Sequence, residues 1–99
     1  MTSPPLADLI EKIRRLRSYC DLSQESVARE MSMTQPAYSK LESGKTRLTV
    51  QHLQTFANLI GISLNDLLTR PVDELIHQIN DRRDFPPPQM NPPENSSQN

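Results

Sequence analysis

Three cations lie close together in the middle of the chain, at Lys40, Lys45 and Arg47. Ammonium and guanidinium groups bind phosphate oxygens, so a surface that gathers them can hold an anionic polymer even in a chain of net charge −1. Residues 1–48 hold eight Lys or Arg against six Asp or Glu, whereas residues 49–99 hold three against six. The alternative is that these cations only keep the surface solvated.

The segment TQPAYSKLESG, residues 34–44, leads directly into these cations. Only Tyr38 and Leu41 have the apolar character and helical spacing needed for burial, and the remaining positions are mostly polar. So small an apolar face indicates that the rest of the helix contacts something other than the protein core. Residues 34–47 are therefore the candidate binding segment.

Catalytic and metal-binding patterns are not evident in the sequence. Cys20 is the single cysteine, and His52 and His77 lie too far apart for the usual spacing of zinc ligands. Glu25 and Glu30 are interpreted as charges on a helix surface, and neither a glycine-rich phosphate loop nor a nucleophile motif occurs. We expect no enzyme activity, no metal and no cofactor.

Apolar residues recur at helical spacing along most of the chain, and no stretch alternates as a strand would. The pattern predicts an all-α fold of six helices, at about 5–19, 24–31, 35–42, 50–60, a short segment from Ser63, and 71–83. The foldable part, about residues 5–84, lies near the lower size limit for one core, and dimerisation would help to stabilise it.

The ends of these helices carry recognisable capping residues. Predicted N-caps precede four of the helices, at Ser23, Thr34, Thr49 and Ser63. Gly44 and Gly61 follow the third and fourth helices as C-terminal stops. Asp66, three residues after Ser63, is expected to complete a capping box there.

The last segment, FPPPQMNPPENSSQN at residues 85–99, contains five of the nine prolines and little that can be buried. It is predicted to be a disordered tail. No apolar run approaches the ~20 residues of a membrane helix, and the first residues lack the pattern of a secretion signal. With one cysteine and no membrane segment, a cytoplasmic protein is expected.

Two segments of the sequence carry a resemblance to a known family: LSQESVAREMSMTQPAYSKLESGK and LTVQHLQTFANLIGISLNDLL. Together they resemble the lambda-repressor and Cro-like helix-turn-helix family, also called the XRE family, over roughly residues 9–69. The resemblance implies a five-helix DNA-binding domain at 5–69 with its motif at 24–43. It also implies that helix 35–42 enters the major groove of double-stranded DNA.

The resemblance assigns roles to individual positions. The expected base-reading residues are Gln35, Ala37, Ser39 and Lys40, and the expected phosphate contacts are Gln24, Thr34, Ser43, Lys45 and Arg47. Arg17 and Glu42 match a structural pair that joins the first and third helices.

Three positions depart from the family pattern. Ser32 stands where glycine is usual, so it must adopt a left-handed backbone at some cost, and Asp21 replaces another customary glycine. Pro36 occupies a position that reads a base in some relatives, which proline cannot do by hydrogen bonding. Base reading should therefore depend more on the neighbouring positions.

The predicted sixth helix, in segment 70–84, carries an apolar stripe with two alternative roles. The stripe either folds back on the core or forms a dimer or partner contact; its members are Val72, Leu75, Ile76 and Ile79. The leading hypothesis is a dimeric repressor that binds a palindromic operator. The alternative is an antitoxin-type DNA-binding protein whose last helix and tail bind a partner protein.

Overall fold

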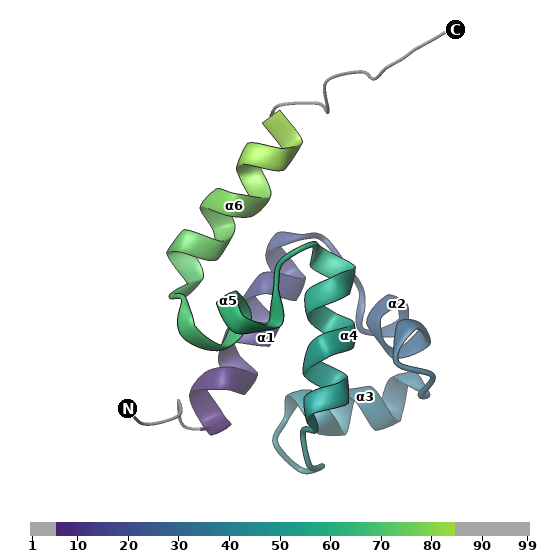
Figure 1. The fold of residues 1–99 in the computed structure, drawn as a ribbon. Helices are drawn as coiled ribbons and strands as arrows, with labels where there is room; N and C mark the ends of the chain where they lie inside the picture. Colours follow the sequence, from purple (N-terminus) through teal and green to yellow (C-terminus); the bar gives the residue numbers. More distant parts are fainter. Residues whose placement is uncertain (1–5, 85–99) are drawn as a thin grey trace, which may run out of the picture.

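A computed structural model describes residues 6–84, with side chains described as far as residue 81. Helices alone form the regular structure within that range, so the all-α prediction is confirmed (Figure 1). They are α1 Leu6–Tyr19, α2 Gln24–Glu30, α3 Gln35–Glu42, α4 Val50–Ile60, α5 Leu64–Thr69 and α6 Val72–Asp84. The predicted tail at 85–99 lies outside the described residues. None of the described helices is long and apolar enough to cross a membrane.

Side-chain oxygens begin four of the helices, as predicted. The hydroxyls of Ser23, Thr34, Thr49 and Ser63 each accept a hydrogen bond from the backbone N–H three residues further on. The capping box was predicted at the wrong helix. It occurs at α4, where His52 Nδ1 accepts from the Thr49 N–H, while the Asp66 carboxylate accepts from Gln78 instead.

Four helices are followed, one or two residues after their last residue, by a residue with a left-handed backbone: Asp21, Ser32, Gly44 and Gly61, with φ of 60°, 57°, 82° and 80°. In each case the following N–H bonds back to a carbonyl five residues earlier, as Met33 does to Ala28 at 2.9 Å and Lys45 does to Lys40 at 2.9 Å. This is the Schellman arrangement, which turns the chain sharply and satisfies a helix-end carbonyl. Asp21 and Ser32 adopt the strained geometry expected of them.

The core collects the apolar faces of all six helices. Its largest fully buried side chains are Tyr38, Phe56, Ile13, Leu16, Leu41, Leu67, Leu75 and Val27. A polar contact also joins the first and fifth helices. Lys12 Nζ donates to the carbonyls of Leu67 and Arg70 at 2.8 and 2.9 Å, at the C-terminal end of α5. Desolvation lowers the pKa of Lys12.

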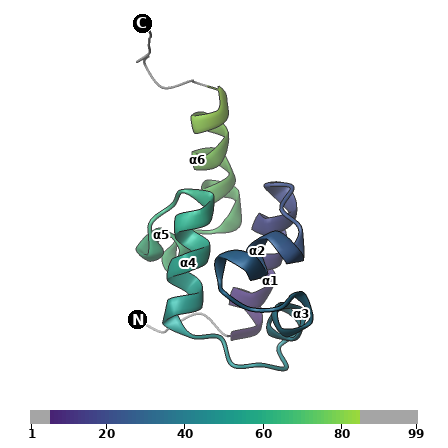
Figure 2. The same ribbon diagram turned by 90° about the vertical axis from the view of Figure 1, so that its right-hand side faces the viewer.

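Helix α6 packs against α1 at the opposite end of the molecule from α3 (Figures 1 and 2). Leu75 and Ile79 are buried in the common core, whereas Val72 and Ile76 are half-buried. Tyr19 of α1 donates its hydroxyl to Asn80 of α6. The stripe on α6 is therefore folded back on the core, and Leu75 and Ile79 present no exposed side chain to a partner.

Candidate nucleic-acid interface

Helices α2 and α3 are joined by a tight turn at residues 31–34 and pack closely against each other. Only three residues of α3 are buried, namely Tyr38, Leu41 and Glu42. The rest of the helix lies at the edge of the molecule, as Figure 2 shows. This is the arrangement of a helix-turn-helix unit that presents its second helix outward.

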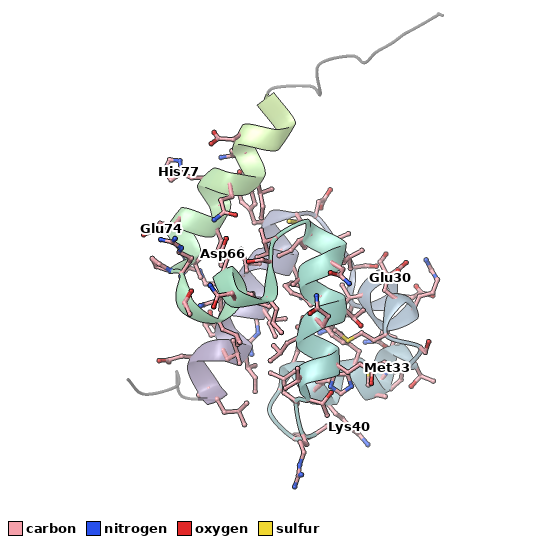
Figure 3. All side chains as sticks on the ribbon, in the orientation of Figure 1. Glu30, Met33, Lys40, Asp66, Glu74 and His77 are labelled. Atoms are coloured by element: carbon pink, nitrogen blue, oxygen red, sulfur yellow. The ribbon has the colours of Figure 1, made fainter. Side chains whose placement is uncertain are left out.

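The outward face of α3 carries four predicted base-reading residues. Gln35 and Lys40 are exposed, and Ala37 and Ser39 are half-buried. In Figure 3, Lys40 points away from the body of the molecule, on the side opposite Glu74 and His77 of α6. Pro36 is accommodated in the first turn, where its missing N–H is not needed.

Arg17 and Glu42 form the ion pair that the resemblance implies, between α1 and the last residue of α3. Arg17 Nε lies 2.5 Å from Glu42 Oε2, and the side chains of Arg17 and Glu42 are only 16% and 4% exposed. A second Arg17 nitrogen donates to the Leu22 carbonyl at 2.7 Å, which secures the turn before α2. The pair thus locks the orientation of the helix-turn-helix unit on α1.

Glu42 also accepts from Tyr38 at 2.6 Å and from Gln24 at 3.0 Å. Burial by itself would raise the pKa of Glu42, but hydrogen bonds from Arg17, Tyr38 and Gln24 outweigh burial and lower that pKa. Burial, with the hydrogen bond to Glu42, raises the pKa of Tyr38. Glu42 is therefore an ionised carboxylate, and Tyr38 is a neutral donor.

Gln24 and Gln35 lie in contact, which sequence reasoning did not foresee. Gln35 Nε2 donates to Gln24 Oε1 at 2.8 Å, and Gln24 Nε2 donates to Glu42. Each glutamine is the first residue of its helix, directly after an N-cap. That shared position is the signal that could have suggested their pairing. Gln24, expected to contact phosphate, keeps one Nε2 hydrogen for that purpose.

The other expected phosphate contacts surround α3. Thr34 accepts from the Ala37 N–H, which leaves its hydroxyl hydrogen available. Ser43 instead donates its hydroxyl to the Lys40 carbonyl at 3.0 Å, so a phosphate bond requires that hydroxyl to rotate. Lys45 and Arg47 are exposed in the loop between α3 and α4.

Arg14 of α1 reaches the same end of α3. One of its nitrogens donates to the Glu42 carbonyl at 3.1 Å, and another pairs with Glu11 at 3.0 Å. A cation at a helix C-terminus is stabilising because it meets unpaired carbonyls. Within residues 6–81, no group of three or more His, Cys, Asp or Glu side chains is placed to hold a metal ion.

This fold and this outward helix define a helix-turn-helix DNA-binding protein. The family model described as "Helix-turn-helix" matches residues 13–67, more than half of the sequence. The chain therefore belongs to this family, of the XRE type, and is a DNA-binding transcriptional regulator rather than an enzyme.

Two curated relatives are similar to it. The control protein C.MunI of Mycoplasma sp is 34% identical over 59 residues, which cover 59% of this chain and 80% of that protein. The HTH-type transcriptional regulator DdrOP3 of Deinococcus deserti is 35% identical over 60 residues, covering 61% of this chain and 46% of that regulator. The chain thus matches about half the length of the latter. No solved structure matches significantly.

Proposed function

We propose that the protein is a dimeric repressor that places α3 in the major groove of a palindromic operator. In this proposal, bases are read by Gln35, Ala37, Ser39 and Lys40, and phosphates are bound by Gln24, Thr34, Ser43, Lys45 and Arg47. Occupancy of an operator near a promoter blocks access by polymerase. The partner is double-stranded DNA, and a second copy of the chain completes the reading unit.

The observation that carries the proposal is the exposed carboxamide of Gln35 at the first position of α3. A carboxamide can bond adenine at two points in the major groove, accepting from N6 and donating to N7. Ala37, two residues further along α3, offers a methyl group to a thymine methyl. The Pro36 side chain cannot hydrogen-bond a base, so base reading depends on its neighbours.

Cations and hydroxyls beside the reading helix supply the contacts that fix its register. Lys45 and Arg47 lie in the loop directly after α3, and both are exposed. Phosphate contacts of this kind position a protein on the duplex without specifying sequence. They complement the polar face of α3 and account for binding by a chain of net charge −1.

A dimer follows from the small reach of one α3 helix. Helix α3 has eight residues, so a single copy of it can reach only a few base pairs. Two symmetry-related copies place two reading helices about 34 Å apart on one face of the duplex, one helical turn from each other. The expected operator is an inverted repeat with half-site centres about 10 base pairs apart.

Selection from a random duplex library tests the reading role. The wild-type chain should enrich an inverted repeat, and Gln35→Ala should reduce affinity for it by about 1–3 kcal/mol while binding to unrelated DNA is unchanged. Gln54→Ala, an exposed glutamine on α4, is the matched control and should bind as wild type. Unchanged operator affinity in Gln35→Ala would remove Gln35 from the reading set.

A second candidate function, an antitoxin-type regulator, is favoured by the position of α6. This helix lies away from α3, and its exposed polar residues include Glu74 and His77 (Figure 3), together with Asp73. A partner protein bound there would leave the DNA-binding face open. Co-purification of a second small protein from the native host supports this function, and its loss on charge reversal at Glu74 would place the contact on α6.

A further inference from the structure

The geometry points to Glu42 as a positioning residue for base reading: acting through Gln24, it fixes which end of the Gln35 carboxamide meets the DNA. Glu42 itself lies inside the domain and is only 3% exposed. The inference rests on the proposed role of Gln35 in reading a base. It adds a buried residue that sets specificity without touching the operator.

The first step is the polarity of the contact between Glu42 and Gln24. An ionised carboxylate accepts hydrogen bonds and donates none. Two nitrogens of Arg17 hold the two oxygens of the Glu42 carboxylate, Nε at Oε2 at 2.5 Å and Nη2 at Oε1 at 3.3 Å, so the Oε1 atom has a fixed position. Gln24 must therefore turn its Nε2 atom toward Glu42, at 3.0 Å, and its Oε1 atom away.

The second step transfers this polarity to the DNA-facing helix. The Oε1 atom of Gln24 can only accept, so Gln35 must approach it with Nε2, at 2.8 Å. Nε2 of Gln35 then retains one hydrogen to donate, and its own Oε1 remains able to accept. Gln35 therefore presents its remaining N–H donor and its carbonyl oxygen in one arrangement and not in the flipped one.

That order matters because adenine presents an acceptor, N7, and a donor, N6, at fixed positions in the major groove. A carboxamide restrained before binding loses less conformational freedom on binding than one that can flip. Without Glu42 as an obligate acceptor, both orientations of the Gln24 and Gln35 amides become available. Adenine would then compete with bases that suit the reversed order.

The test compares variants in the random-library selection. Wild-type protein should show one position in each half-site at which adenine is preferred by about 5- to 150-fold, the range of a bidentate contact. In Glu42→Gln, the new amide can donate or accept, so the preference at that position should fall at least fivefold while the other positions stay selective. Gln24→Met, which removes the intermediate amide, should relax the same position.

Two further variants separate positioning from stability. Tyr38→Phe removes a different hydrogen bond to Glu42 and should weaken the fold but keep the adenine preference. If Glu42→Gln leaves Arg17 unpaired and unfolds, the double change Arg17→Met with Glu42→Gln removes both charges and is used in its place. Circular dichroism confirms folding of each variant before selection.

The outcomes divide cleanly. If Gln35→Ala erases the position but the Glu42 and Gln24 variants keep it, the positioning role is overturned and base reading by Gln35 stands. If Gln35→Ala also keeps the position, or no motif is enriched, the proposed function fails and this inference fails with it. The inference is supported if Gln35→Ala, Glu42→Gln and Gln24→Met all lose the adenine preference at that one position while Tyr38→Phe keeps it.

Discussion

At the residue scale, the buried carboxylate of Glu42 links the helix-turn-helix unit to α1, and it makes stability depend on pH. Its pKa is lowered in the folded protein below the ordinary value of 4.5. A group whose pKa falls on folding contributes stability above its unfolded pKa, and this contribution is lost as the pH drops through the folded pKa. The free energy of unfolding should therefore decrease from about pH 4.5 downward.

Urea unfolding measured from pH 7 to pH 3 checks this prediction. The double variant Arg17→Met with Glu42→Gln should lose less stability over that range than wild type, because the titrating group is gone. Glu11→Gln, whose side chain is 54% exposed, is the control and should follow wild type. An equally steep acid loss in the double variant would show that other groups determine it.

Whether a side-chain contact can be predicted from the sequence depends on how many other residues position the two side chains. The pairing of Arg17 with Glu42 was implied by the family resemblance, because both positions match a known structural pair. The contact between Gln24 and Gln35 was missed because their shared position at the start of a helix suggests proximity only, and the contact also needs two side-chain conformations that the sequence does not determine. The assigned DNA contacts remain predictions, because the structure describes the chain alone.

At the element scale, the turn between α2 and α3 carries a correctable strain at Ser32. Its φ of 57° is left-handed, which costs a residue with a side chain about 1 kcal/mol relative to glycine. The Ser32 side chain is exposed. Ser32→Gly should thus raise the free energy of unfolding by about 0.5–1 kcal/mol, as measured by urea denaturation.

A matched glycine change shows whether the gain comes from backbone geometry. Ser18→Gly lies in the last turn of α1, where the backbone is helical, and it should lower stability by up to about 1 kcal/mol. Both variants replace serine by glycine, but the backbone is left-handed at Ser32 and helical at Ser18. A loss of stability in Ser32→Gly would indicate that the hydroxyl, and not the backbone, determines the position.

The link from α1 to α5 is a second feature of the elements with a measurable effect. Lys12 donates to two carbonyls at the C-terminal end of α5, where a cation also meets the helix dipole. Lys12→Met keeps the aliphatic stem but loses both bonds, so we expect destabilisation of about 1–2 kcal/mol. Arg15→Met, an exposed residue of the same helix, should change stability by less than about 0.5 kcal/mol.

Local signals predicted most of the elements because helix ends depend on nearby residues. Ser23 and Thr34 mark the two starts of the motif, and Gly61 marks the end of α4. The capping box was misplaced because His52 can return a hydrogen bond as well as an acidic residue can. The contacts of Lys12 could not be predicted, since nothing local reveals the carbonyls 55 and 58 residues away.

At the scale of the whole molecule, α6 is part of the same core as the five helices before it. Leu75 and Ile79 are 0% and 4% exposed, so the segment 70–84 shares its packing with residues 6–69. Cutting the chain after Thr69 would expose core surface as well as remove a contact helix. A point change on the outer part of the stripe is a cleaner test of assembly than truncation.

The last prediction concerns the dimer that a palindromic operator requires. Val72 and Ile76 are the half-buried members of the stripe, and we propose that they contact the second copy. Ile76→Asp should give a folded monomer in sedimentation, because a carboxylate in an apolar dimer contact is left unpaired. Operator affinity should then fall toward that of a single half-site.

Two variants locate the effect on that face of α6. His77→Asp changes the next, exposed residue and should remain dimeric. Leu75→Ala creates a cavity in the core and should destabilise each subunit by about 2–5 kcal/mol without changing the contact surface. If Ile76→Asp sediments as a dimer, the interface lies elsewhere, and half-buried apolar residues of α4 and α5 such as Leu59 and Leu64 become the next surface to change.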